Sequence, residues 1–448
     1  MRHMPLIAIC LGYFMVILDA TVVNVALPAL GHDLGGGVSG LQWVVDGYTL
    51  VFAGLLLSAG SLGDRLGGRH VFLGGLVLFT VASAACAAAP SVPLLVGARV
   101  AQGLGAALLV PSSLALLRAA YHDPSERARA IGTWGAVAGI AAASGPVIGG
   151  VLVAALSWRA VFLLNLPVGL TGLLLAWRHL PPAGERTGIG FDPAGQTLAV
   201  AALTLLTFGV IEEALVPLLV SVALLAAFVA WEHRTREPML PLGLFRNPTF
   251  SGASFVGLAI NLGFYGQLFV ISLYFQHVRG WSALATGLAL LPEGIFVALS
   301  SALSGRAMGR VGPRLPMITG LLCGGAGLSG LAAAGDQTSY VLLVPALIAA
   351  GFGMAFTMPA ATNAIIGAAP AERAGIASGV LNASRQAGGA VGVALLGTLV
   401  GSGAFIPGLR TAMLVAGGAF FVAAAVAALT VERRVGSPAG CSPARSST

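Results

Sequence analysis

About fourteen long apolar segments fill this chain, and they constrain its fold more than any other feature. They lie roughly at 5–30, 39–61, 70–89, 93–118, 130–153, 160–178, 195–212, 214–231, 249–274, 283–304, 315–334, 340–366, 374–400 and 410–430. A helix needs about 20 apolar residues to cross the hydrocarbon core of a bilayer. The sequence therefore predicts an all-α integral membrane protein with about 14 transmembrane helices, the seventh and eighth joined by a tight turn at Glu212 and Glu213.

The composition excludes a water-soluble domain of this size. Charged residues make up 9% of the chain and hydrophobic residues 57%, and the mean hydropathy is +0.92, whereas soluble proteins carry about 25% charged residues. The net charge of +7 comes from arginines, since the chain has no lysine. Cytoplasmic loops of membrane proteins are enriched in such residues. The positive charge is therefore explained by loops beside a lipid bilayer, which is the expected partner. Nucleic acid is not expected as a partner.

The arginines are distributed unequally over the loops. Most lie in alternate loops, starting at the N-terminus, while the opposite loops contain only Arg159, Arg279 and Arg410. Because basic residues are enriched on the cytoplasmic side, this pattern predicts a multi-pass protein of the cytoplasmic membrane with both termini inside. The first segment is too long for the core of a signal peptide and is interpreted as a retained helix.

No motif in the sequence indicates a metal or an organic cofactor. The cysteines, Cys10, Cys86, Cys323 and Cys441, do not pair at metal-ligand spacing, and a disulfide framework is not expected. There is no GxxxxGK[ST] loop, and the cytoplasmic loops are too short for a nucleotide-binding domain. ATP is therefore not expected to bind.

Three short motifs recur in the same order, roughly 245 residues apart. GSLGDRLGGR (60–69) matches GRAMGRVGPR (305–314), GLGAALLVP (103–111) matches GFGMAFTMP (351–359), and PSERARA (124–130) matches PAERAGI (370–376). Parallel repeats in a polytopic protein are typical of transporters that rock about a central site. We predict a six-helix bundle at 1–180, two extra helices with linkers at 181–246, a second six-helix bundle at 247–432 and a disordered cytoplasmic tail at 433–448.

The loop at 60–69 resembles the signature loop of the major facilitator superfamily. Further stretches are similar to motifs of its fourteen-helix drug:proton antiporter branch: LDATVVNVALP (18–28), RVAQGLGAA (99–107), SGPVIGG (144–150), SWRAVFLLNLPVG (157–169) and PMLPLGLFRN (238–247). The resemblance implies the major facilitator fold, with two six-helix bundles plus two extra helices. It also implies an exporter of small hydrophobic compounds, with the proton gradient as its energy source.

Two of these motifs carry predicted roles. The resemblance implies a gate latch in the 60–69 loop, formed by Gly60, Asp64, Arg65, Gly67 and Arg69. The second copy has Gly309 in place of Asp64, so the latch is expected on one side only; the alternative is that the basic residues only fix the topology.

In the fifth segment, Gly135, Gly139, Ala142, Pro146 and Gly149 fall on one helical face almost without side chains. The antiporter motif itself, Gly139, Gly145, Pro146, Gly149 and Gly150, is implied to form a seal against leak, although close packing alone would also explain it.

Ionisable groups inside a bilayer are costly and therefore indicate function. Asp19, Asp46, Arg99 and Glu293 are the candidates for proton coupling. At about 1.5 Å per residue, the first three fall in the outer half of the first bundle, on helices expected to lie close together. A carboxylate beside an arginine stays ionised, whereas a desolvated one is driven towards protonation. A proton and a substrate would then compete for the acidic site. Asp46 could instead be a group at a helix start near the outer interface.

Aromatic and amide side chains in the ninth and thirteenth segments predict a roomy apolar cavity for a small hydrophobic substrate. The candidate cavity residues are Gln102, Asn261, Tyr265, Gln267 and Arg385. Some of them could instead face lipid or form hydrogen bonds between helices. Two other functions remain open: a major facilitator carrier for a sugar or another metabolite, and, more remotely, a polytopic membrane enzyme. An enzyme is not expected, because the seven histidines are scattered over loops and no HExxH motif occurs.

Overall fold

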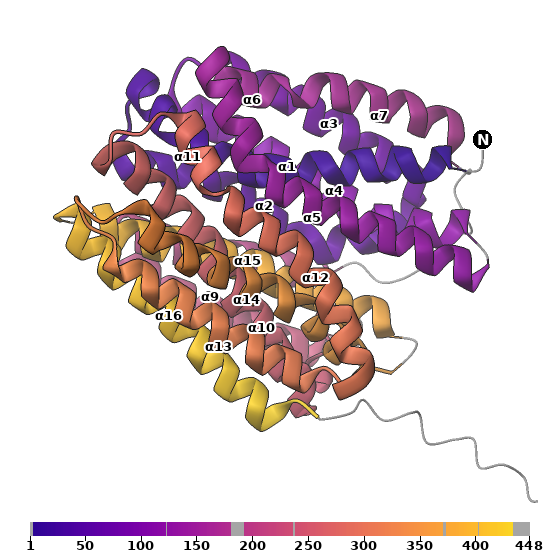
Figure 1. Cartoon of the computed structure of the whole chain (residues 1–448). Helices are drawn as coiled ribbons and strands as arrows, with labels where there is room; N and C mark the ends of the chain where they lie inside the picture. The colour runs from indigo at the N-terminus through magenta and orange to yellow at the C-terminus, as the bar shows by residue number, and fades with distance from the viewer. Residues whose placement is uncertain are drawn as a thin grey trace, which may run out of the picture.

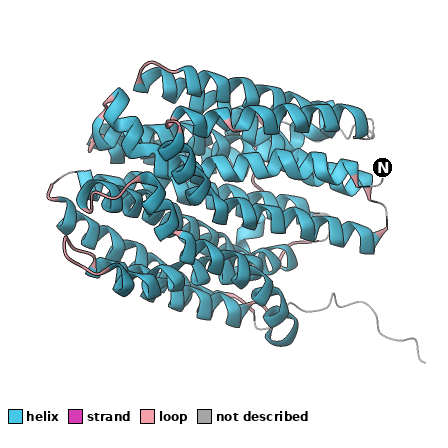
Figure 2. Cartoon of the chain, turned by 45° about the horizontal axis from the view of Figure 1, so that its top comes forward, coloured by secondary structure: helices cyan, strands magenta, loops and turns pink. Residues whose placement is uncertain are grey.

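The computed structural model describes residues 3–121, 123–180, 192–235, 238–370, 373–401 and 403–432. Throughout these ranges the chain forms helices joined by short turns and loops (Figure 2). The tail predicted at 433–448 lies outside the described residues.

The helices follow one another with few residues between them (Figure 1). Their bounds are α1 Met4–Leu34, α2 Gly37–Leu66, α3 Gly68–Ala88, α4 Val92–Ala120, α5 Pro124–Ala155, α6 Arg159–Leu163, α7 Asn165–His179, α8 Pro193–Ile211, α9 Leu215–Arg234, α10 Pro248–Leu273, α11 Ala283–Ala289, α12 Leu291–Val311, α13 Arg314–Gly330, α14 Tyr340–Gly367, α15 Ala374–Gly401 and α16 Phe405–Thr430. Short 3₁₀-helices lie at Leu242–Arg246 and Leu331–Ala333, and a π-helix at Tyr274–Val278 extends α10.

Twelve helical segments within the described residues are long and apolar enough to cross a membrane. They include α8 and α9, which meet at a turn where Glu213 has a positive φ of 51°. Of the segments expected from the sequence, those at 39–61 and 374–400 are not among the twelve. They correspond to α2 and α15, which form helices of 30 and 28 residues. The all-α membrane architecture is confirmed, with twelve candidate spans.

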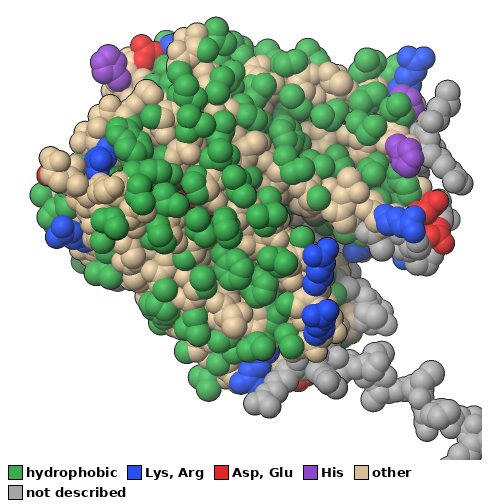
Figure 3. Space-filling view, viewed as in Figure 1, with side chains coloured by type: hydrophobic (Ala, Val, Ile, Leu, Met, Phe, Trp, Pro, Cys, Tyr) green, Lys and Arg blue, Asp and Glu red, His purple; other side chains and the backbone are tan. Residues whose placement is uncertain are grey.

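The helices form two groups, seen one above the other in Figure 1. We call α1–α7 the first half, α10–α16 the second half, and α8–α9 the accessory hairpin. The chain enters α1 and leaves α16 at the same end of the molecule, which we call the terminus end; the opposite end is the far end. Apolar side chains cover the middle of the surface, and charged ones gather towards the two ends (Figure 3). This distribution is what a bilayer requires.

The two halves contact each other towards the far end. On one side of the molecule α2 packs against α15, and on the other side α5 packs against α11 and α12. Gln42 of α2 donates to the backbone oxygens of Val393 at 3.2 Å and Ala394 at 2.7 Å. Gln276 donates to the backbone oxygen of Val25 at 3.0 Å. These contacts close the far end.

The halves separate towards the terminus end. Gly135 and Gly139 of α5 have open space beside them, and so do Gly305 and Gly309 of α12. The space-filling view shows a hollow between the halves at this end (Figure 3). The molecule is therefore open towards its termini and closed at its far end.

The accessory hairpin is attached mainly to α2. Near the far end, the Glu212 carboxylate accepts hydrogen bonds from Ser39 at 2.9 Å and Trp43 at 3.0 Å. Near the terminus end, Gln196 donates to the backbone oxygen of Gly54 at 2.5 Å. α8 also packs against α15, where the Thr398 hydroxyl donates to the backbone oxygen of Val210 at 3.1 Å.

Candidate functional site

A buried ion pair lies at the centre of the first half. Asp19 is in the middle of α1 and is 0% exposed, and Arg99, on α4, is 1% exposed. The guanidinium Nη1 donates to Asp19 Oδ2 and also to the amide oxygen of Gln102, at 2.7 Å. Removing two charges from water is expensive, and only close pairing with further hydrogen bonds offsets that cost.

Neutral side chains complete the surroundings of the carboxylate. Gln102 and Asn165 both donate to Asp19 Oδ1, at 3.1 and 2.9 Å. The same two amide groups donate to the hydroxyl oxygen of Ser83, at 2.7 and 2.8 Å. Asp19 thus accepts bonds from three side chains, and we call Asp19, Ser83, Arg99, Gln102 and Asn165 the carboxylate cluster. These interactions tie α1, α3, α4 and α7 together.

A fifth helix holds the arginine in place. Arg99 Nε donates to the backbone oxygen of Val44 on α2 at 3.0 Å, and the guanidinium carbon lies 4.3 Å from the centre of the Tyr48 ring. A cation over an aromatic face gains electrostatic stabilisation, more so when water is excluded. The guanidinium is therefore held on several sides by helices of the first half, which together fix its position.

The carboxylate cluster differs from the sequence prediction in two ways. Gln102, predicted to line the substrate cavity, lies fully buried beside Asp19. Ser83 and Asn165 were not among the predicted site residues. Asn165 is a polar residue inside the SWRAVFLLNLPVG motif, so its position in an apolar segment was a signal that could have identified it.

Asp46 lies apart from the ion pair. It is fully buried, and within the described residues neither of its carboxylate oxygens has a hydrogen-bond partner. It shares a face of α2 with Gln42 and Thr49, which contact α15. Asp46 thus lies on the side of α2 that faces the second half. It is also about two and a half turns into α2, a position that does not fit the alternative of a group at the helix start.

Glu293 is the buried carboxyl group of the second half. It lies in the first turn of α12 and is 3% exposed. One oxygen accepts a bond from Gln267 on α10 at 3.2 Å, whereas the other oxygen and the Gln267 amide oxygen have no hydrogen-bond partner among the described residues. An acidic group at a helix start is favoured by the helix dipole. Glu293 and Gln267, predicted for different roles, are therefore direct neighbours.

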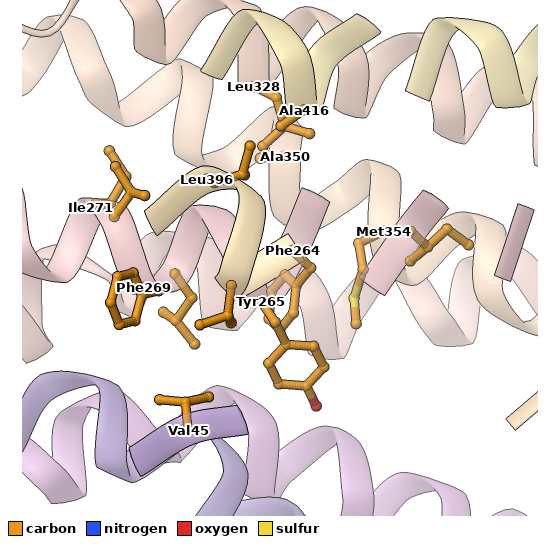
Figure 4. Close-up of a cluster of buried hydrophobic side chains, with 14 of the residues drawn as sticks. Val45, Phe264, Tyr265, Phe269, Ile271, Leu328, Ala350, Met354, Leu396 and Ala416 are labelled. Atoms are coloured by element: carbon orange, nitrogen blue, oxygen red, sulfur yellow. The ribbon is translucent and has the colours of Figure 1, made fainter. Parts of the chain in front are cut away.

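Arg385 of α15 lies between the halves. Its guanidinium donates to the amide oxygens of Asn261 at 3.4 Å and Asn382 at 3.2 Å. Tyr265, from α10, points its hydroxyl towards the helices of the first half (Figure 4). Asn261, Tyr265 and Arg385 are thus brought together on the wall of the second half that faces the first, and their role in a substrate cavity stays a prediction.

The sequence of the chain matches the model of the Major Facilitator Superfamily over residues 9–393. The chain belongs to this superfamily. It is 37% identical to the methylenomycin A resistance protein of Streptomyces coelicolor, over 88% of this chain and 85% of that protein. It is 39% identical to the multidrug resistance protein Stp of Mycobacterium tuberculosis, over 89% of this chain and 75% of that protein. It is 37% identical to the tetracenomycin C resistance and export protein of Streptomyces glaucescens, over 89% of this chain and 76% of that protein.

Solved structures share the fold at low sequence identity. A peptide transporter POT in complex with sulfate has a TM-score of 0.72 at 15% identity, covering 95% of this chain and 93% of that chain. A bacterial homologue of the human lysosomal transporter Spinster, in an inward-facing and unoccupied conformation, has a TM-score of 0.67 at 18% identity, covering 96% of each chain. Family and relatives point to a transporter rather than an enzyme.

The signature loop of this Major Facilitator protein links α2 to α3. Gly67 has a φ of 89°, a left-handed conformation that favours glycine, and Gly312 at the matching position of the second repeat has 73°. Arg69 donates to the backbone oxygen of Trp177 at 2.6 Å, at the end of α7. Gly60 lies within α2 and Arg65 is exposed, while the side chain of Asp64 lies outside the described part. The latch therefore stays a prediction.

The antiporter motif of this Major Facilitator chain packs against two other helices. A side chain at Gly145 would overlap Thr21 of α1, and a Cβ at Gly149 would lie 2.7 Å from the backbone oxygen of Val22. A Cβ at Gly150 would lie 2.6 Å from the backbone oxygen of Ala283 on α11.

The remaining motif positions divide between the two ends of α5. Pro146 lies against Gly287 of α11, whose backbone leaves no room for a side chain, whereas Gly139 faces open space. The close packing predicted for α5 is thus found only in its far half, at the junction of the two halves.

Proposed function

We propose that this transporter is a proton-coupled antiporter that exports small hydrophobic drugs or antibiotic-like metabolites across the cytoplasmic membrane. The Asp19–Arg99 ion pair carries the proposal, because it places a titratable group at the centre of a molecule open at one end. The names of the relatives, which describe antibiotic resistance and multidrug resistance, support the choice of substrate.

The coupling follows from the neutrality of the pair. With Asp19 ionised, its charge compensates Arg99, and the three donors around the carboxylate are satisfied. Protonation of Asp19 removes that compensation and leaves Arg99 as a buried cation, which changes the preferred packing of α1 against α4. A proton and a bound substrate thus favour different arrangements of the same helices. Asp46 and Glu293 are proposed as further protonation sites.

The proposed topology has fourteen spans and both termini in the cytoplasm. α2 and α15 complete the twelve candidate spans, since helices of 30 and 28 residues exceed the thickness of the hydrocarbon core. The arginine-rich loops favour the cytoplasmic side for the terminus end. In this orientation the hollow between the halves opens to the cytoplasm, the side from which an exporter takes its substrate.

The proton gradient is sufficient as the energy source. One charge moving through 100 mV releases about 2.3 kcal/mol, enough for a roughly 50-fold substrate gradient per proton. Neither ATP nor another cofactor is needed in this scheme. A carrier for a sugar or another metabolite remains the second candidate, but the resistance functions named for the relatives favour drug export.

The test is transport into inverted membrane vesicles driven by an imposed pH gradient, acid inside. We expect the wild type to accumulate a fluorescent hydrophobic drug, and Asp19→Asn to reduce proton-driven uptake by about 100-fold. Asp33→Asn is the matched control, because Asp33 is on the same helix but lies exposed at the far end, paired with Arg159. Unchanged uptake by Asp19→Asn would reject the coupling role, and no gradient-driven uptake of any tested drug would reject antiport.

A further inference from the structure

Arg385, on the wall of the second half that faces the first, is a cation without an anionic partner among the described residues. It lies about 16 Å from the start of α15, and its hydrogen bonds go to the neutral amides of Asn261 and Asn382. Arg99 and Arg159 form ion pairs with Asp19 and Asp33, but no carboxylate among the described residues pairs with Arg385. An uncompensated charge at this depth is costly and indicates a function.

The buried carboxyl groups on the surrounding helices do not compensate this charge. Asp19 is neutralised by Arg99, and Asp46 receives no hydrogen bond from any described residue. Glu293 is bonded to Gln267, which lies about 120° around α10 from Asn261 and therefore faces other helices than Arg385 does. Within the described part of the chain, the positive charge of Arg385 has no partner of opposite sign.

An aromatic pair lies opposite this charge. Tyr13 of α1 and Trp134 of α5 stack with ring centres 3.9 Å apart and planes inclined by 6°. On α15, Ala383 packs against the apolar cluster that includes Tyr13, and the Tyr265 ring lies beside Gly389, one turn from Arg385. Beside Trp134, α5 is uncovered, because Gly135 and Gly139 have open space next to them. Trp134 and Arg385 are both partly exposed, so a molecule entering from the terminus end can reach the Trp134 side of the aromatic pair and the guanidinium.

We propose that the cavity binds planar aromatic anions, with a carboxylate, phenolate or sulfonate on Arg385 and the ring system against Tyr13 and Trp134. A guanidinium presents paired N–H donors that match a carboxylate or sulfonate, and such charge-assisted bonds are stronger than neutral ones. Asn261 and Asn382 hold the guanidinium in place without neutralising it, so its charge stays available to a ligand. The flat aromatic pair supplies apolar contact for the rest of the molecule.

The inference rests on the proposed export function and adds a substrate class to it. It also predicts how charge moves in the transport cycle. If one proton enters for each monoanion that leaves, both movements carry positive charge inwards. The membrane potential then drives both steps, and an anionic substrate is exported against a steeper gradient than a neutral one.

The test compares three probes that share a naphthyl ring and carry a negative, a neutral and a positive group: 2-naphthoate, 2-naphthylmethanol and (2-naphthylmethyl)trimethylammonium. Binding is measured by equilibrium dialysis with the purified full chain in lipid nanodiscs. We expect naphthoate to bind about tenfold more tightly than the other two, and Arg385→Gln to reduce naphthoate affinity about tenfold without changing that of the alcohol. Arg385→Lys should keep most of the preference, because it keeps the charge. Arg159→Gln is the control, since it removes a positive charge at the far end.

The aromatic pair is tested with a second ligand pair. Trp134→Leu should weaken binding of naphthoate several-fold more than binding of hexanoate, which has the carboxylate but no ring. Equal affinity of the wild type for the cation and the anion, or unchanged naphthoate binding by Arg385→Gln, would overturn the proposal. Size-exclusion profiles and Tm values identify variants that fail to fold; if Arg385→Gln fails, the affinities of the wild type for naphthoate and for the cation decide the proposal. Because binding needs no proton gradient, its outcome is separate from that of the antiport assay.

Discussion

The two halves of the molecule share a packing plan but organise their buried charges differently. In the first half, Asp19 and Arg99 form one neutral pair surrounded by neutral donors. In the second half, Glu293 and Arg385 are separate, and among the described residues each has only amide partners. The two repeats thus share their helix packing but not their buried charged groups. The closed pair suits an exchange of protons, and the unpaired groups suit the binding of something from outside the protein.

The shared packing plan is visible in the glycines. In the first half, Gly145 and Gly149 let α5 approach α1, and in the second half Gly388 and Gly392 let α15 approach α10. In both cases a glycine seam brings two helices close enough for backbone contact, which is the usual way that helices associate in membranes. The seam is therefore a property of the repeat, whereas the charges are properties of each half.

The strongest contrast is expected from removing each arginine. Arg99→Leu leaves Asp19 as a buried charge without compensation, which costs about 3–5 kcal/mol, so its Tm in detergent should fall steeply. Arg385→Leu breaks no ion pair and should change stability by about 1 kcal/mol or less. The double variant Asp19→Leu, Arg99→Leu should recover most of the loss. Equal destabilisation by the two single variants would contradict the contrast.

The glycine seams should respond to a single added methyl group. A Cβ at Gly392 would overlap the backbone oxygen of Leu262, and Gly392→Ala is expected to cost about 1–3 kcal/mol. Gly149→Ala should cost less, since its Cβ would lie 2.7 Å from the backbone oxygen of Val22. Gly139→Ala, with no atom within 4 Å, serves as the control in the same thermal unfolding series. A seam that tolerates Gly392→Ala without loss of Tm would not be close-packed.

Glu293→Gln separates the proton chemistry of the halves. Glutamine keeps a partner for Gln267 but cannot be ionised, so we expect proton-driven uptake in inverted vesicles to fall roughly tenfold while Asp19 remains able to couple. Glu212→Gln is the control, because Glu212 is an exposed acid of the accessory hairpin. Wild-type uptake by Glu293→Gln would confine proton coupling to the first half.

The smallest effect is expected where the halves meet. Gln42→Ala removes the two hydrogen bonds to Val393 and Ala394. These bonds stabilise the closed far end by about 1 kcal/mol. Their loss should therefore shift the equilibrium roughly fivefold towards opening at that end. Spin labels at the exposed positions Leu156 and Val341, in a cysteine-free background, would report it as a longer distance. Ser39→Ala, which loses only a bond to the accessory hairpin, should leave the distances unchanged.

Sequence reasoning located the buried charges but not all of their partners. Helical rise placed Asp19 and Arg99 in the outer half of the first bundle, on helices expected to lie close together, and in the structure the two side chains form an ion pair. Depth alone also grouped Asp46 with them, although it lies on the face of α2 that looks towards α15. Ser83 was missed because a serine in an apolar segment usually bonds within its own helix, and only the fold shows which neighbours reach it.

The packing of α5 shows a different limit of the sequence. Periodicity assigned Gly139 and Gly149 to one face without side chains. It could not indicate that the far part of this helix is covered and the other part open. That difference depends on the relative position of the two halves, which the sequence of one helix does not encode.

The accessory hairpin has a consequence for how lipid-dissolved molecules reach the cavity. α8 lies against both α2 and α15, with bonds from Gln196 to α2 and from Thr398 to α8, and so covers the seam between those helices on the membrane side. No described helix covers the opposite seam, and near Gly139 and Gly305 it stands open. In the proposed orientation, a compound dissolved in the inner leaflet therefore has one lateral doorway, between α5 and α12.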